Sequence, residues 1–328
     1  MTRTGAILAL LLAPALMAQA PQKADIGVEN TVGVENVVVT APRQRTRTVI
    51  ENYVMGHAMR APALGKLTRW KLGICPQTTG VPAGFAKLVN QRLRQIAQAA
   101  GAPLAEGPSC RVNIEIVFTR APQALVDDVR KKKPELLGFY PRARLDRIAK
   151  VDHAIQAWYA TQTEDFNGII HTDDPRPTGM TFLMTGESGG NSVLTPSGAS
   201  MPDVTLNLGY ARKMQVRGDR LGDGLRSELY HVMVVVDRGK LEGMQIGPIA
   251  DYIAMMALSQ TGSFDDCEGA PSITNLFAAD CNRGWKTDAI SDIDLAFLRG
   301  LYHMDLAGSF QNQRAAITDA MQTALEAQ

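Results

Sequence analysis

The chain has 328 residues, enough for one large domain or two smaller ones with a buried core. Hydrophobic residues make up 45% of it and charged residues 20%, which excludes a wholly disordered or fibrous protein. The 34 Lys and Arg residues balance the 33 Asp and Glu residues once Arg3 is removed with the first twenty residues. Because no net charge is then left to attract a polyanion, we expect no nucleic-acid partner.

Residues 1–20 have the pattern of a secretory signal peptide. Arg3 supplies a positive charge, residues 6–16 form an apolar run, and Ala-Gln-Ala at 18–20 fits the small-x-small cleavage pattern. An uncleaved anchor is the alternative, but the run is shorter than the roughly 20 residues of a membrane-spanning helix. We therefore expect a periplasmic or secreted protein that has no membrane span after cleavage.

Residues 21–47 are predicted to be a flexible linker. The string Glu-Asn-Val-Val-Val-Thr-Ala at 35–41 resembles the TonB box of TonB-dependent outer-membrane receptors, and it lies just behind the signal peptide, as that box does. The resemblance implies a TonB contact from Asn36 to Ala41, in which the segment adds a strand to a partner's sheet. An ordinary edge strand or linker is the alternative, since the chain lacks the repeated strands of a receptor barrel.

The rest of the sequence predicts an α+β domain at 48–306, followed by a helical tail at 307–328. Alternating or continuous apolar residues predict strands at 70–75, 112–118, 155–161 and 232–236. Helical spacing predicts helices at 85–100, 122–133, 248–259, 292–302 and 313–327. Residues 165–225 are rich in Gly, Pro, Asp and Ser and predict long loops with short strands.

Four cysteines in an exported chain predict two disulfides, for which three pairings exist. We expect Cys75–Cys110, at the ends of two predicted strands, and Cys267–Cys281, which enclose a short loop. Closing this loop would contribute about 3 kcal/mol by restricting the unfolded chain. Free buried thiols are the alternative, whereas a zinc site is disfavoured because no two cysteines have C-x-x-C spacing.

Three segments near the C-terminus carry a family resemblance. Residues 251–258 form an apolar helix, 271–277 read Pro-Ser-Ile-Thr-Asn-Leu-Phe, and 291–302 form a helix that ends in Leu-Tyr. Their order resembles the active-site helix, the Met-turn (with Thr274 in place of methionine) and the closing helix of zincin metalloproteases of the metzincin branch. The resemblance implies a zincin-like mixed sheet with packed helices and a degenerate active-site helix at about 247–259.

The residues that carry the chemistry of this family are absent. In the H-E-x-x-H-x-x-G-x-x-H motif, Asp251 stands at the first histidine, Tyr252 at the glutamate, Met255 at the second histidine and Thr261 at the third. A catalytic zinc needs about three protein ligands and an open position for water, and a thioether is a poor zinc ligand. We therefore predict no bound metal and no cofactor, and we expect this helix to retain a packing role.

The sequence offers two further kinds of candidate site, a histidine-containing cluster and a serine motif. The histidines are spread along the chain, at His57, His153, His171, His231 and His303. The cluster at 171–174, His-Thr-Asp-Asp, fits a solvated turn better than a metal site. Ser188 lies in a G-x-S-x-G string that resembles the Gly-Asp-Ser-Gly-Gly of chymotrypsin-like proteases. No strand-to-helix pattern flanks it, and the helix expected near 83–100 does not fit a double β-barrel.

The sequence thus predicts an exported, non-catalytic zincin-like protein with a binding or assembly role in the cell envelope. Residues 154–161, with Trp158 and Tyr159, are the candidate edge strand that would pair with an extended peptide or an envelope protein. An interior strand with aromatic core residues is the alternative for this segment. A serine hydrolase that uses Ser188 and a TonB-linked accessory protein are the alternative functions.

Overall fold

The computed structural model of the protein describes residues 47–107, 109–174, 181–184, 204–207, 223–261 and 266–327. The predictions for the signal peptide, for nearly all of the linker with Asn36 and Ala41, and for Ser188 lie outside the described residues. Within them, no helix combines the length and the apolar composition that crossing a membrane would require.

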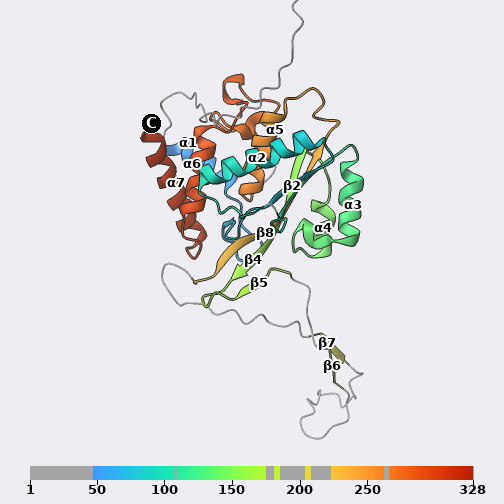
Figure 1. Cartoon of the computed structure of the whole chain (residues 1–328). Helices are drawn as coiled ribbons and strands as arrows, with labels where there is room; N and C mark the ends of the chain where they lie inside the picture. Colours follow the sequence, from blue (N-terminus) through green and yellow to red (C-terminus); the bar gives the residue numbers. More distant parts are fainter. Residues whose placement is uncertain are drawn as a thin grey trace, which may run out of the picture. The chain divides into compact units, whose positions relative to one another are not determined.

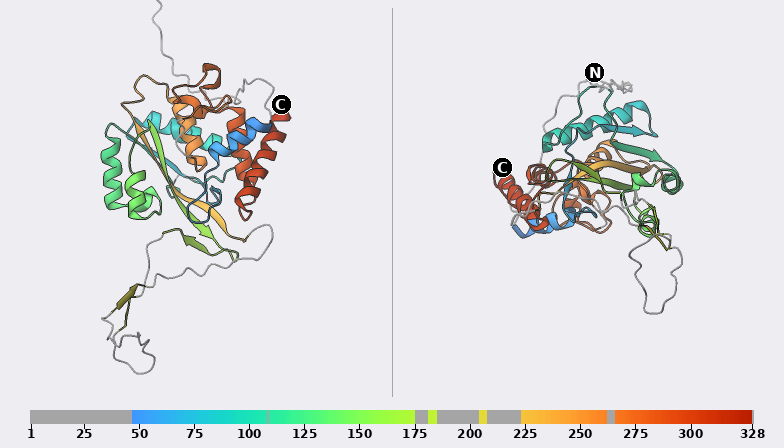
Figure 2. Two further views of the ribbon diagram at one scale, coloured as in Figure 1. Left: turned by 180° about the vertical axis from the view of Figure 1, so that it is seen from behind. Right: turned by 90° about the horizontal axis from the view of Figure 1, so that it is seen from below.

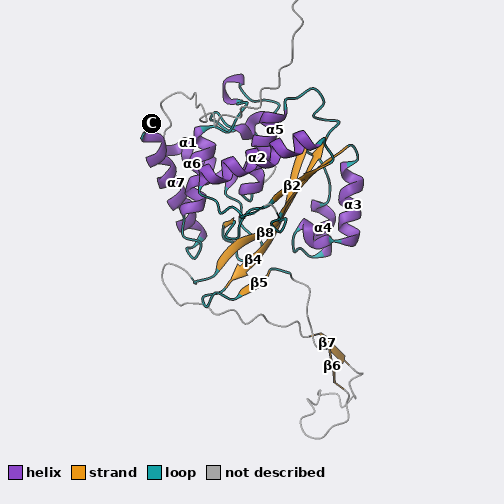
Figure 3. Cartoon of the chain, viewed as in Figure 1, coloured by secondary structure: helices purple, strands orange, loops and turns teal. Residues whose placement is uncertain are grey.

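Figure 1 and Figure 3 show the helices and strands along the chain. The helices are α1 (Arg47–His57), α2 (Ala83–Ala100), α3 (Pro122–Lys132), α4 (Arg142–Ile148), α5 (Ile246–Leu258), α6 (Asp292–His303) and α7 (Phe310–Glu326). The strands are β1 (Thr68–Arg69), β2 (Pro76–Thr79), β3 (Ile114–Thr119), β4 (Ile155–Glu164), β5 (Ile170–Thr172), β6 (Thr181–Met184), β7 (Val204–Asn207) and β8 (Arg226–Asp237). Short 3₁₀ turns lie at Pro134–Leu137, Ile273–Leu276 and Arg283–Trp285.

Six of the strands form one mixed sheet. Its order is β2-β3-β8-β4-β5, and β1 pairs with the start of β8. Strands β1, β2, β3 and β8 are parallel, whereas β4 is antiparallel to β8 and β5 is antiparallel to β4. Strands β6 and β7 form a separate antiparallel pair. The predicted α+β class with a mixed sheet is therefore confirmed.

Helices cover both faces of this sheet, which is why β8 is buried over nearly its whole length and continuously apolar from Val232 to Val236. On one face, Trp158, Met233 and Val235 pack against α3, α4 and the turn between them. On the other face lie α2 and α5, and the Tyr159 hydroxyl donates a hydrogen bond to the carbonyl of Met256 in α5. Figure 2 shows the sheet between these two groups of helices. The core therefore has three layers.

Most predicted elements are present within a few residues of their predicted bounds, but the strand predicted at 70–75 is wrong. Pairing with the sheet is confined to β1 before this segment and β2 after it, and Ile74 forms an isolated bridge with Leu104. Trp70 is buried and donates its indole N–H to the Ala257 carbonyl at 2.8 Å, while Gly73 lies against the Ala105 backbone. The segment is therefore a connection that buries Trp70 and Ile74 and leaves Leu72 exposed, and not a strand of the sheet.

Two described helices, α1 and α4, were not predicted. Helix α1 begins at the last residue of the predicted linker and buries Ile50, Tyr53, Val54 and His57. This spacing is that of one helix face. Helix α4 is only seven residues long and carries three arginines, so its apolar pattern is too short to recognise.

The predicted tail forms α7, which packs against α6 and α1. Ile317 and Met321 are fully buried, and Gly300 of α6 allows Ile317 to approach its backbone closely. The Gln313 side chain accepts a hydrogen bond from the Leu67 amide and donates one to the Leu306 carbonyl. Arg47, the first residue of α1, donates hydrogen bonds to Asp319 and Gln322 of α7. The first and last described helices are therefore in direct contact.

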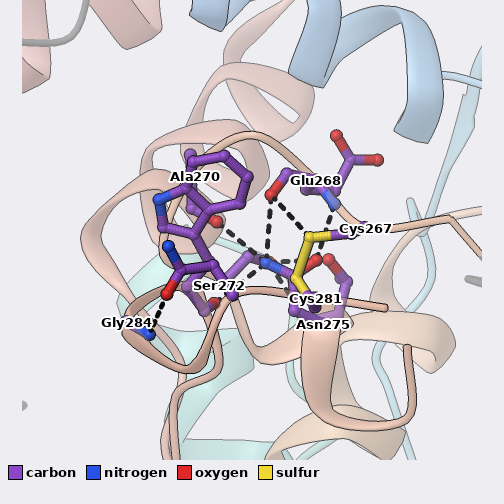
Figure 4. The surroundings of a disulfide bond; sticks show 10 residues. Cys267, Glu268, Ala270, Ser272, Asn275, Cys281 and Gly284 are labelled. Atoms are coloured by element: carbon purple, nitrogen blue, oxygen red, sulfur yellow. Dashed lines mark hydrogen bonds between the residues drawn. A yellow bond between two sulfur atoms is a disulfide. The ribbon is translucent and has the colours of Figure 1, made fainter. Parts of the chain in front are cut away.

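Both predicted disulfides are present. Cys75–Cys110 joins the segment before β2 to the segment before β3, and its Cα atoms are 5.9 Å apart. Cys267–Cys281 closes a loop with a sequence separation of 14 residues. Figure 4 shows Asn275 inside this loop, where its amide group donates hydrogen bonds to the carbonyls of Glu268, Ala270 and Trp285. The second disulfide thus encloses a loop that is also hydrogen-bonded internally.

We expect the double variant Cys267→Ser/Cys281→Ser to lose about 3 kcal/mol of unfolding free energy, because the unfolded chain gains the entropy of an open 14-residue loop. Urea denaturation followed by far-UV circular dichroism measures this difference. The control is Asp280→Ser, a change at an exposed neighbouring residue that should cost less than about 0.5 kcal/mol. A loss below about 1 kcal/mol in the double variant would show that the internal hydrogen bonds alone hold the loop.

Candidate functional site

Two adjoining cavities lie along the outer edge of β4. One, of about 270 Å³, is lined by Gln156, Ala157, Trp158 and Tyr159 together with residues of the α4 region and of the end of α5. The other, of about 260 Å³, is lined by Tyr159 and Thr161 on the β4 side. Both cavities share Tyr140, Arg144 and Tyr159 as wall residues, so they adjoin at these side chains. We call the pair of cavities the β4 groove.

The backbone of β4 is only partly paired on the side of this groove. The Asp237 amide donates to the Ala154 carbonyl, so the register directs the backbone groups of Ile155, Ala157 and Tyr159 away from β8. On that outer side, β5 pairs with β4 only from Gln162 onwards. In the described ranges, no strand pairs with the outer edge of β4 before that point. Of these residues, Ala157 and Tyr159 line the groove, and the Tyr159 carbonyl lies against Gly138.

Trp158 and Tyr159 anchor this strand to the two helical layers. Trp158 is 3% exposed and donates its indole N–H to the Ile148 carbonyl at 2.8 Å, at the end of α4. Tyr159 is 9% exposed, and its hydroxyl donates to Met256 at 3.0 Å on the opposite face. Burial raises the pKa of Tyr159 to about 12, so the hydroxyl keeps its proton at neutral pH. The two side chains belong to the core while the backbone between them borders the groove.

The four degenerate motif positions on and after α5 do not converge on one point. Asp251 accepts hydrogen bonds from the Arg92 guanidinium at 2.5 and 2.8 Å and from the Ile290 amide at 2.8 Å. Tyr252 packs edge-on against Phe277, with ring centroids 4.9 Å apart. Met255 is fully buried. These three residues are therefore engaged in packing within the core.

Thr261 is the degenerate position that lines the β4 groove, and α5 contributes Met256 to the same wall, followed by Gln260. The groove thus receives a thioether, an amide and a hydroxyl from this part of the chain. The sequence analysis did not identify Met256 or Gln260: Met256 follows Tyr252 at the four-residue spacing of one helix face, whereas Gln260 lies beyond the end of α5. It also missed Arg144 and Arg147, which lie three residues apart on α4.

A buried polar cluster joins α1, the segment at 272–274 and α6. The Asp294 carboxylate accepts hydrogen bonds from the hydroxyls of Tyr53, Ser272 and Ser291 at 2.5, 2.5 and 2.7 Å. It also accepts the amides of Ile273 and Ser291. Ser291 and Asp294 form a reciprocal capping box at the start of α6. This cluster fixes the 272–274 segment against α6.

His57 lies beside this cluster and is completely buried. Burial lowers the pKa of His57 to about 4, whereas burial, followed by the nearby Asp266 and Asp294, raises the pKa of Glu268 to about 7. The His57 Nδ1 atom is 3.6 Å from a Glu268 oxygen and 2.8 Å from the Tyr53 carbonyl. At neutral pH the imidazole is therefore uncharged. The Ser272 hydroxyl donates to Asp294, so these residues do not form a Ser-His-Asp relay.

A third cavity, of about 550 Å³, lies between β1 and the end of α6 and is lined by Arg69, Lys71 and Arg226. Lys71 forms ion pairs with Glu164 and Glu228, and Arg226 lies 3.7 Å from Glu164. The Arg69 guanidinium donates to the Tyr302 carbonyl. Two of the three cations, Lys71 and Arg226, are therefore already neutralised by the carboxylates of Glu164 and Glu228.

No group of three His, Cys, Asp or Glu side chains that could hold a metal ion occurs within the part of the chain that the structure describes. Comparisons of the chain with protein-family models, with curated proteins and with solved structures returned no match.

Proposed function

We propose that this protein is an exported, non-catalytic peptide-binding protein of zincin-like architecture, which accepts an extended peptide as an added strand on the outer edge of β4. The observation that carries the proposal is the outer edge of β4 before Gln162, where the backbone of Ala157 faces away from β8 and the residue lines the β4 groove. In strand addition, such backbone groups supply affinity, and pockets for alternate side chains supply specificity.

The dimensions of the groove support an extended ligand. Its walls include β4 residues from Gln156 to Thr161. At about 3.3 Å per residue, six residues of a strand span about 20 Å. Two adjoining cavities along that edge would accept side chains from a peptide that pairs with it.

The chemistry of the groove supports binding without catalysis. The side chains that α5 and the residues after it bring to the wall are Met256, Gln260 and Thr261. A zincin would need imidazole or carboxylate ligands and a general base at such a helix. Along the chain, β4 is followed by α5, the 272–274 segment and α6. This order resembles that of an edge strand, an active-site helix, a Met-turn and a closing helix, and so supports the proposed zincin-like architecture. The two disulfides support the location of the protein in an oxidising compartment, in agreement with the predicted signal peptide.

The test uses the mature chain and a fluorescent decapeptide selected from a random library for binding to it. We expect Ala157→Pro to weaken binding by at least about tenfold, because proline removes the N–H that the peptide carbonyl would accept. Proline is tolerated on an edge strand whose N–H is unpaired, so the melting temperature should change little. Fluorescence anisotropy measures the affinity, and mass spectrometry of the recovered peptide shows whether it is intact.

The matched control is Ala157→Ser, which retains the backbone N–H and should bind as the parent does. A peptide methylated at a backbone nitrogen that pairs with β4 should also lose affinity, whereas methylation one residue further should not. Equal affinity of the proline and serine variants would rule out strand addition at β4. A cleaved peptide would rule out the non-catalytic assignment.

A further inference from the structure

One wall of the β4 groove carries three exposed cations. Arg144 and Arg147 project from α4, and Lys150 follows this helix. Asp152 is the carboxylate that lines the same cavity, and Asp146, which precedes Arg147 in sequence, pairs with Arg130. Among the described residues, none of the three cations forms an ion pair, in contrast to Arg130 of the same helical layer, which pairs with Asp146. Three cations and one carboxylate therefore line this cavity, which leaves an excess of positive charge on its wall.

The position of Arg144 connects this charge to the backbone edge. Its guanidinium carbon lies 4.5 Å from the centre of the Tyr140 ring, and both residues line both cavities together with Tyr159. A guanidinium that stacks on an aromatic face keeps the N–H groups around its own edge available for hydrogen bonds. A carboxylate beside Tyr159 could accept two of them at once.

We propose that the strand which β4 accepts is acidic, with Asp or Glu side chains that pair with Arg144 and Arg147. This inference rests on the proposed function. The two arginines are three residues apart on one face of α4, and alternate side chains of an extended strand are spaced by about 7 Å. Successive carboxylates on one face of a bound strand could therefore meet successive cations, which a single C-terminal carboxylate could not do.

The experiment compares two decapeptides that differ only in having glutamate or glutamine at alternate positions, both amidated at the C-terminus. We expect the glutamate peptide to bind with a Kd about tenfold lower at low salt. This advantage should shrink as the salt concentration rises from roughly 20 mM to roughly 500 mM, because the cations are exposed and screened.

Arg144→Gln/Arg147→Gln should remove the preference for glutamate, so that the two peptides bind this variant with similar Kd values. The matched control is Arg142→Gln, an exposed arginine of the same helix that does not line either cavity, and it should keep the preference. Equal binding of the two peptides, with Ala157→Pro still weakening both, would overturn the acidic preference and leave strand addition standing. Failure of Ala157→Pro to weaken either peptide would instead refute the proposed function.

Discussion

Asp294→Ala is expected to lower the free energy of unfolding by about 3–5 kcal/mol. The carboxylate is fully buried and accepts five hydrogen bonds, from Tyr53, Ser272, Ile273 and twice from Ser291. Its removal leaves several buried donors without an acceptor and also removes the capping box of α6. Urea denaturation monitored by circular dichroism measures the loss.

Two further variants locate the cause of this effect. Asp294→Asn keeps one oxygen acceptor and should lose less than the alanine variant. Asp288→Ala changes an exposed carboxylate just before α6 and should cost less than about 0.5 kcal/mol. If Asp294→Ala and Asp288→Ala unfolded at the same urea concentration, the cluster would not stabilise the fold.

Arg92→Ala is expected to destabilise the protein by about 3 kcal/mol, because it leaves the Asp251 carboxylate buried without its partner. Asp251 is 2% exposed, and both of its oxygens accept hydrogen bonds from Arg92. The side-chain hydrogen bond to Asp251 in turn raises the pKa of Arg92. The loss would be read from chemical denaturation at pH 7.

A double variant separates the lost charge pair from lost packing. In Arg92→Ala/Asp251→Asn the buried charge is absent and the asparagine can still accept the Ile290 amide, so stability should partly return. A double variant that is less stable than Arg92→Ala would contradict the explanation by an unpaired buried charge. Recovery would show that Asp251 is a structural residue that ties α5 to α2.

The elements that could be predicted from the sequence are those with strong local signals. Helix α2 has helical spacing over five turns and a glycine with positive φ at its end, and β8 has an unbroken apolar run. The disulfide pairing followed from loop length and strand ends. The segment from Trp70 to Ile74 has the apolar alternation of a strand, but it is a connecting segment in which Trp70 and Ile74 are buried and Leu72 is exposed. Only tertiary contacts distinguish the two.

The candidate site could be predicted only in outline. Residues 154–161 were singled out as an edge, and the structure leaves part of that edge unpaired within its described ranges. The alignment of α5 with a zinc motif could not show which residues meet the groove. Every residue from Ile249 to Leu258 is buried, so the helix has no polar stripe from which its orientation could be read. Met256 and Thr261 reach the groove because of how α5 packs.

The contact between Arg47 of α1 and the residues of α7 bears on when this protein can fold during its synthesis. Helix α7 is synthesised long after α1, and its buried face carries Ile317 and Met321. The surfaces of α1 and α6 that contact α7 therefore stay uncovered on a growing chain until α7 has been made. Packing of this part of the core has to wait for a helix that lies more than 250 residues further along the chain.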